Sequence, residues 1–262
     1  MKLNDAMDQV RLYESVQGTL AFYSSANPLF QEPNQDAASI FVKEPWTVLA
    51  VADGVGGSRG GKQAADLAIE ILQKGLSQAF KEGGAIRETL LKVFEEANEA
   101  ILKLGIGAAT TLMVVLIEEK EFQTLHVGDS ACLLVGGGGK LKFRSVDHSV
   151  VGYGQEADLI DQGEVHEHQQ RHVLLNCLGS TEMRVDLGPK KELYQRDRLL
   201  VASDGLFDNL TETELASILR KGPIKKQAKL LLESCQSRMH TKTKDLGLHK
   251  PDDLTFILYK LI

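Results

Sequence analysis

The sequence predicts an α+β fold in which antiparallel sheets are covered by helices. Apolar runs rich in β-branched and aromatic residues, typical of strands, occur along most of the chain, whereas helical periodicity is confined to two pairs of segments. Strand and helix signals do not alternate between residues 105 and 205, as a parallel nucleotide-binding sheet would require. Short turns at Glu118–Lys120 and Gly136–Gly139 instead join consecutive strands, which is typical of antiparallel pairing.

The element boundaries follow from these patterns and from the residues that interrupt them. The predicted strands cover residues 19–25, 37–43, 46–52, 109–117, 121–127, 130–135, 172–177, 198–203 and 254–260. The predicted helices cover residues 62–80, 86–104, 212–220 and 224–240. Gly83 and Gly84 separate the first two helices. Thr211 followed by Glu214 forms a capping box at the start of the third helix.

The composition indicates a single domain over residues 1–262. The 262 residues are 43% hydrophobic, which is enough to bury a core, and no repeat of fixed period or Pro-rich linker divides the chain. The formal net charge is −6 and no run of Lys or Arg is present, so we expect neither nucleic acid nor a membrane surface as a partner. No coiled-coil heptads or hydrophobic tail indicate an oligomer, and we expect a monomer.

Three features indicate a cytoplasmic protein. No segment approaches the ~18 consecutive apolar residues of a membrane-spanning helix. The first residues, Met1–Gln17, lack the apolar centre of a signal peptide. Cys132, Cys177 and Cys235 are odd in number, lie far apart and do not have metal-ligand spacing. We therefore expect reduced cysteines in a cytoplasmic compartment.

A glycine-rich stretch after Asp53 allows two interpretations. Gly56–Lys62 has the spacing of a phosphate-binding loop, but the Ser or Thr that should follow Lys62 is Gln63. Alternatively, Asp53 ends a buried strand and the glycines let metal ligands approach closely. The strand-rich order of elements favours the metal interpretation. A nucleotide hydrolase, the rejected alternative, would depend on Lys62.

Aspartates stand at the ends of several predicted strands. Asp53, Asp129 and Asp204 each follow an apolar strand. Asp36 and Asp252–Asp253 each precede one. A single aspartate at a strand end usually caps a turn, but carboxylates that converge repel one another unless cations compensate. Because the set contains no His or Cys, we expect Mg²⁺ or Mn²⁺ rather than Zn²⁺. Two such ions can activate water near neutral pH and neutralise phosphoryl oxygens, which is the chemistry of phosphate-ester hydrolysis.

A series of motifs resembles the bacterial metal-dependent protein phosphatases, known as PPM or type 2C serine/threonine phosphatases. The motifs are NQD at 34–36, ADGVGGSRGG at 52–61, GAATTLMVVLI at 107–117, LHVGDSACLL at 125–134, DHS at 147–149, LLNCLGS at 174–180, LLVASDGLFDNLTETEL at 199–215 and DDLTFIL at 252–258. They extend over roughly residues 19–260, which leaves a short N-terminal extension of about residues 1–18. The resemblance implies an αββα sandwich of two antiparallel sheets flanked by helix pairs, with metal ions between the sheets at one end.

The resemblance also implies the metal ligands. Asp53 resembles the carboxylate that bridges two Mn²⁺ or Mg²⁺ ions, and the carbonyl oxygen of Gly54 would bind one of them. Asp204 and Asp252 would complete the shell of the first ion.

Two further roles follow from the same resemblance. Asp36 resembles the acid that orients metal-bound water, and with Asp53 and Asp204 it forms the implied catalytic set. Asp129, together with Asp204, resembles the weaker site for a third metal ion.

The sequence departs from the family pattern at several positions. Family members carry an Arg that grips the substrate phosphate five residues before the position of Asp36, where this chain has Gln31. Arg59, in the glycine loop, is the candidate to supply the missing cation; the alternative, which is the commoner case, is a solvated loop arginine. Ala131 replaces an Arg of the family, which alters packing more than chemistry, and Asp253 stands where the family has Asn and is not assigned as a ligand.

The histidines are interpreted as structural or solvated. The DHS motif contains His148, but no GxSxG nucleophile motif accompanies it, so a hydrolase triad is not expected. His166, His168 and His172 lie in the polar stretch 149–172, for which a solvated loop is preferred to a metal site. By resemblance, this stretch is a short version of the flap that borders the active site.

These observations predict a Mn/Mg-dependent phosphatase that removes phosphate from phosphoserine and phosphothreonine by attack of a metal-bridging hydroxide, without a phosphoenzyme. Its substrates would be phosphoproteins made by a Ser/Thr kinase. The alternative is a pseudophosphatase-like binding or regulatory module that retains the fold but has weak or no turnover, because the phosphate-binding Arg is missing. Turnover that requires Asp53 and Asp204 distinguishes the enzyme from this module.

Overall fold

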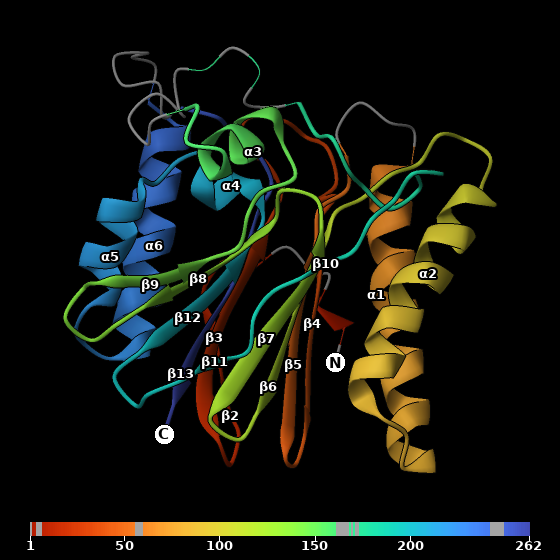
Figure 1. The fold of residues 1–262 in the computed structure, drawn as a ribbon. Helices are drawn as coiled ribbons and strands as arrows, with labels where there is room; N and C mark the ends of the chain where they lie inside the picture. The colour runs from red at the N-terminus through yellow and green to blue at the C-terminus, as the bar shows by residue number, and fades with distance from the viewer. Residues whose placement is uncertain are drawn as a thin grey trace.

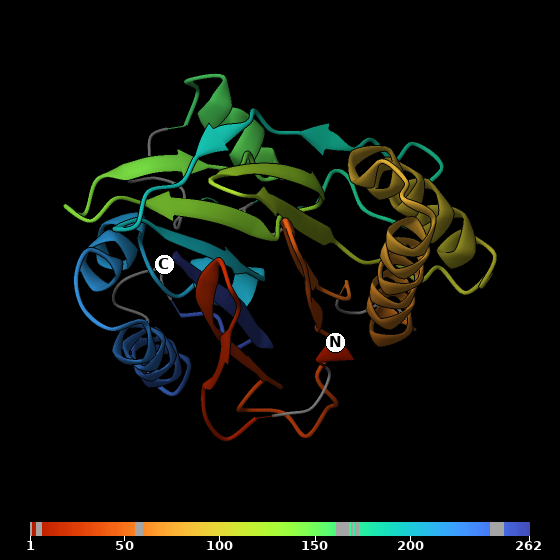
Figure 2. The same ribbon diagram turned by 90° about the horizontal axis from the view of Figure 1, so that it is seen from below.

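Two antiparallel sheets pack face to face, and a pair of helices covers the outer side of each (Figure 1, Figure 2). The computed structural model describes residues 2–3, 7–55, 60–160, 168, 170, 173–241 and 249–262. Every pairing between neighbouring strands in the two sheets is antiparallel. This arrangement confirms the α+β class and the αββα sandwich.

The first sheet carries the helix pair α1 (Gly61–Glu82) and α2 (Ile86–Leu102) on its outer face. Its strands, in spatial order, are β1 (Lys2–Leu3), β4 (Ala37–Lys43), β5 (Trp46–Ala52), β6 (Leu112–Glu118), β7 (Glu121–Val127) and β10 (Asp186–Leu187), and β11 (Lys191–Glu192) also pairs with β7. Side chains alternate along β5, so that Ala50 packs beneath the helices whereas Leu49 and Val51 belong to the core between the sheets.

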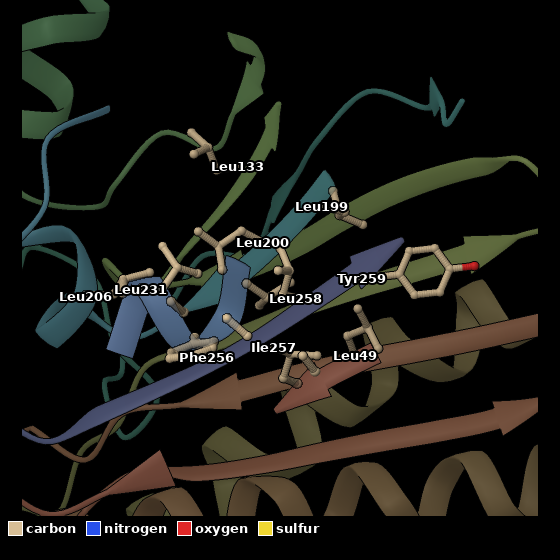
Figure 3. Packing of buried hydrophobic residues seen from close by; sticks show 14 of the residues in the cluster. Leu49, Leu133, Leu199, Leu200, Leu206, Leu231, Phe256, Ile257, Leu258 and Tyr259 are labelled. Carbon is tan, nitrogen blue, oxygen red and sulfur yellow. The ribbon is translucent and has the colours of Figure 1, made fainter. Parts of the chain in front are cut away.

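The second sheet is covered by α5 (Glu212–Leu219) and α6 (Ile224–Met239). Its strands, in spatial order, are β2 (Arg11–Glu14), β3 (Gly18–Ser25), β13 (Leu254–Leu261), β12 (Arg198–Ala202), β8 (Ala131–Val135) and β9 (Leu141–Arg144). Figure 3 shows Leu200 and Ile257 of neighbouring strands in the same buried cluster as Leu231 of α6. Buried leucines and aromatic rings thus join this sheet both to its helices and to the first sheet.

Two short helices lie at one end of the sandwich. They are α3 (Val150–Glu156) and α4 (Asp204–Phe207), at the top of Figure 1. Strands β5 and β7 end just before Asp53 and Asp129, which lie in the loops that follow them, and β12 ends just before Asp204 at the start of α4. The antiparallel topology therefore brings aspartates that are distant in the chain to strand ends at the same end of the sandwich.

Several elements differ from the sequence-based expectation. The strand predicted over 172–177 is wrong for its described part, where Leu174 makes only an isolated bridge to Ser149. The polar stretch expected to be a loop begins with helix α3. Part of the segment expected to be an extension forms β2, which pairs with β3. The capping box of Thr211 and Glu214 is present at the start of α5. Among the described residues, no helix is both long and apolar enough to span a membrane.

Candidate metal centre

A cavity of about 270 Å³ lies where these loops meet, and carboxylates dominate its lining. The carboxylates that line it are Asp53, Asp129, Asp204, Asp252 and Asp253. Apart from the consecutive Asp252 and Asp253, these residues are far apart in the chain, and their convergence at one cavity is what the strand-end pattern predicted. All-oxygen surroundings of this kind suit hard divalent cations such as Mg²⁺ and Mn²⁺.

Asp53 is fixed by its backbone at the end of β5. Its N–H donates to Thr111 Oγ1 (2.9 Å), and its carbonyl oxygen accepts from the Thr111 N–H (2.8 Å) and from Thr110 Oγ1 (2.8 Å). Gly54 packs directly on the start of α1, because a Cβ at this position would lie 2.4 Å from the Gly61 carbonyl carbon. Only glycine allows this approach, which holds the Asp53 corner against the helix.

Asp36 lies buried beside the cavity, just before β4. Ser203 donates its hydroxyl to Asp36 Oδ2 (2.8 Å), whereas the buried Oδ1 has no hydrogen-bond partner. Burial, and then the charge of Asp253, raise the pKa of Asp36 to about 8. An unpartnered, buried carboxylate oxygen next to a carboxylate cluster fits the position of an acid that orients a metal-bound water.

The segments that carry Asp204 and Asp252 are joined tightly. The Ser203 N–H donates to the Thr255 carbonyl (3.0 Å), and the Thr255 N–H donates to Ser203 Oγ (3.1 Å). A Cβ on Gly205 would lie 1.9 Å from the Asp253 carbonyl oxygen, so the two chains are in backbone contact. This contact fixes the relative positions of the two implied ligands.

Asp253 organises the loop that leads to Asp36. Its Oδ1 accepts from the Asn27 N–H (2.7 Å) and its Oδ2 accepts from the Gln35 N–H (2.5 Å). Both carboxylate oxygens are therefore engaged with backbone donors. The interpretation of Asp253 as a residue that is not a ligand stays a prediction.

The carboxylates raise one another's pKa. Burial, and then the charge of Asp36, raises the pKa of Asp53 well above its usual range. Burial, and then the charge of Asp204, raises the pKa of Asp129 in the same way and that of Asp252 to about 6. Divalent cations would favour the ionised carboxylates and relieve this repulsion, so the residues present fit metal ions.

Lys250 is a site residue that the sequence analysis missed. Its Nζ contacts carboxylates of Asp204, Asp208 and Asp252. Burial lowers the pKa of Lys250, but the three carboxylate charges outweigh burial and raise the pKa above its ordinary value. The position of Lys250, two residues before the implied ligand Asp252, was the one available signal.

Of the two candidates for phosphate binding, only Gln31 belongs to the described residues. Gln31 is exposed and does not line the cavity, whereas Gln35 does. Arg59 lies outside the described residues, as do two of the three flap histidines; only His168 is described. Phosphate binding by Gln31 or Arg59 stays a prediction.

His148 lies outside the cavity lining, in a buried hydrogen-bonded group. Its Nδ1 accepts from the Gly128 N–H (3.1 Å) and from Asn176 Nδ2 (2.8 Å), so the neutral ring carries its proton on Nε2. His126, His148 and Asp186 bring possible ligand atoms within 4.8 Å of one another. Since His148 Nε2 carries the proton, this atom has no lone pair for a metal, and the group fits a structural role.

Comparison with known sequences identifies related proteins. The model of the protein phosphatase 2C family matches residues 30–223. The serine/threonine phosphatase Stp of Listeria monocytogenes is 30% identical over 201 residues, which cover 71% of this chain and 77% of that relative.

Comparison with solved structures gives the same grouping. The serine/threonine phosphatase PstP/Ppp of Mycobacterium tuberculosis superposes with a TM-score of 0.76 at 25% identity, covering 94% of this chain and 99% of that structure. The catalytic domain of the serine/threonine protein phosphatase PstP in complex with two manganese ions has a TM-score of 0.73 at 24% identity, with coverages of 94% and 99%.

Proposed function

Because the chain belongs to the protein phosphatase 2C family of serine/threonine protein phosphatases, we propose that it hydrolyses phosphoserine and phosphothreonine in proteins with two Mn²⁺ or Mg²⁺ ions. The family match confirms the resemblance drawn from the motifs. The observation that carries the proposal is the convergence of Asp53, Asp129, Asp204 and Asp252 on one cavity. The manganese ions in the related PstP structure support the choice of metal.

The proposed ligands come from both sheets. Asp53 would bridge two ions, the Gly54 carbonyl and the carboxylates of Asp204 and Asp252 would complete the binding, and Asp129 with Asp204 would hold a third ion weakly. When bound, the ions supply Lewis-acid chemistry that activates water as hydroxide and neutralises charge on the phosphoryl oxygens, without a phosphoenzyme.

Asp36 is proposed to position the attacking water. Ser203 holds one carboxylate oxygen and so fixes the rotation of the carboxylate, which leaves Oδ1 to accept a hydrogen bond that orients the water. Removing the Ser203 hydroxyl would free this rotation, and it would also remove the hydrogen bond from the Thr255 N–H that helps join the segments of Asp204 and Asp252.

The proposal extends to partners and location. We propose one catalytic domain that acts as a monomer in the cytoplasm on phosphoproteins made by a Ser/Thr kinase. The net charge of −6 argues against anionic polymers as substrates.

The test is hydrolysis of p-nitrophenyl phosphate and of a phosphothreonine peptide by the full chain, with and without Mn²⁺. The wild type is compared with Asp204→Asn. Manganese-dependent turnover that is lost in Asp204→Asn supports the proposal. Absence of turnover in a wild type that still binds Mn²⁺ would favour the binding module, for which the exposed Gln31 in place of an Arg is the specific observation.

A further inference from the structure

Lys250 occupies the middle of a carboxylate group that includes two proposed metal ligands. Its Nζ lies 3.0 Å from Asp208 Oδ2 and 2.9 Å from Asp252 Oδ2, and it also contacts Asp204 Oδ2. The Lys250 side chain is only 24% exposed. The ammonium group, which has three donors, therefore lies within ion-pair distance of three acidic side chains.

The backbone of Lys250 is held in place as well. Its N–H donates to Asn209 Oδ1 (3.2 Å), and its carbonyl oxygen accepts from Asn209 Nδ2 (2.8 Å). Asn209 is fully buried and also donates to the Gly205 carbonyl (2.9 Å), next to Asp204. The backbone of Lys250 and its ammonium group thus both contact the segment that carries Asp204.

No other cation is described at the cavity. Within the described ranges, Lys250 is the only Lys or Arg among the residues that line it. The local charge of the carboxylates is therefore balanced in part by a side chain of the protein itself.

We infer that Lys250 is a built-in cation that competes with divalent metal for the carboxylates of Asp204 and Asp252, and so weakens metal binding at this side of the cavity. Asp204 Oδ2 cannot make its strongest contacts with an ammonium group and with a metal ion at the same time, and the positive charges of Lys250 and the metal ion repel each other. In the proposed site, Asp204 is a ligand of both the first ion and the weak third ion, so Lys250 lowers the affinity for these two ions most. The inference rests on the proposed function for the identity of the ions, but not on turnover.

The test is calorimetric titration of the full chain with Mn²⁺. Lys250→Met removes the charge and keeps most of the length, whereas Lys250→Arg keeps the charge. Lys103→Met is the matched control, because this substitution changes the net charge by the same amount. Lys103 pairs with Glu99 on the exposed surface near the end of α2. Circular dichroism verifies folding, and Lys250→Gln serves if the methionine variant does not fold.

We expect Lys250→Met to bind Mn²⁺ at least about tenfold more tightly than the wild type, or to bind one additional ion, while Lys250→Arg and Lys103→Met behave as the wild type. Unchanged or weaker binding by Lys250→Met overturns the inference. Unchanged Mn²⁺ binding with a raised KM for phosphopeptide also overturns it and assigns Lys250 to the substrate phosphate.

The two proposals fail separately. If the wild type has no turnover but Lys250→Met binds Mn²⁺ more tightly, the phosphatase proposal fails and the role of Lys250 stands. If none of the variants binds Mn²⁺, the role of Lys250 is overturned.

Discussion

Gly205→Ala probes the backbone contact that holds two proposed ligand segments together. The added Cβ would lie 1.9 Å from the Asp253 carbonyl oxygen. The two backbone segments must therefore separate by at least about 1.1 Å to reach the 3.0 Å that real Cβ contacts keep. The obstacle is backbone, which cannot rotate away as a side chain can. Because Asp204 and Asp252 flank this contact, the separation moves both carboxylates apart.

The expected cost has two parts. Overpacking of a buried contact costs about 1–3 kcal/mol, so the free energy of unfolding of Gly205→Ala should fall by that amount. A displacement of about 1 Å in a catalytic group lowers activity roughly 100-fold, so kcat/KM for a phosphothreonine peptide should fall by that factor, and Mn²⁺ should bind more weakly.

Urea unfolding followed by circular dichroism measures the first quantity, and peptide hydrolysis with Mn²⁺ titration measures the second. Gly138→Ala is the control, because Gly138 is exposed and a Cβ there meets nothing within 4 Å. If Gly205→Ala has the same stability, Mn²⁺ affinity and turnover as the wild type, the backbone contact does not determine the geometry of the site, and the reasoning is refuted.

Two further predictions concern residues outside the cavity. Lys62 pairs with Asp66 along α1 (2.8 Å), so Lys62→Ala should change turnover by no more than about twofold; a loss equal to that of Asp53→Asn would support the phosphate-loop alternative. Burial, and then the charge of His126, lowers the pKa of His148 to about 4 from 6.5. Below about pH 6.5 the unfolded chain therefore binds a proton at His148 that the folded chain does not. As the pH is lowered from neutral to about 5, the free energy of unfolding should fall by about 2 kcal/mol from this cause. Urea unfolding at about pH 7.5 and 5 should show this part of the loss absent in His148→Gln; equal losses in both proteins would contradict it.

The sequence predicted the central strands because their patterns are strong and their limits are marked. The limits of β4, β5 and β7 agree with the predicted 37–43, 46–52 and 121–127. Each is an apolar segment that ends at a turn or at an aspartate, so both the strands and the gathering of aspartates could be inferred.

The strand predicted over 172–177 is wrong for its described part because an apolar run does not by itself specify a strand: Val173 and Leu175 are exposed rather than packed in a sheet. Leu174 bridges only Ser149, and the Asn176 side chain pairs with the backbone of Arg184. Its polar groups are satisfied by these contacts rather than by a sheet. Short strands such as β10 and β11 were also missed, because two residues carry no periodic signal.

The details of the site could not be predicted from local patterns. The contact of Gly205 with Asp253 depends on two segments that are distant in the chain. The same holds for Lys250, whose pairing with Asp208 requires the folded positions of α4 and of the segment before β13. A pattern of strand ends indicates which carboxylates converge, but not which cation or glycine lies between them.

The most direct test of the metal-dependent phosphatase is Asp53→Asn, measured for both Mn²⁺ affinity by calorimetry and turnover of a phosphothreonine peptide. Asp53 lines the cavity and is the proposed bridging ligand. Asp66→Asn on α1, outside the cavity lining, removes the same charge and serves as the control. The account predicts that Asp53→Asn loses turnover and binds Mn²⁺ at least about 100-fold more weakly, while Asp66→Asn retains both. Manganese-dependent turnover by Asp53→Asn at the wild-type rate would contradict it.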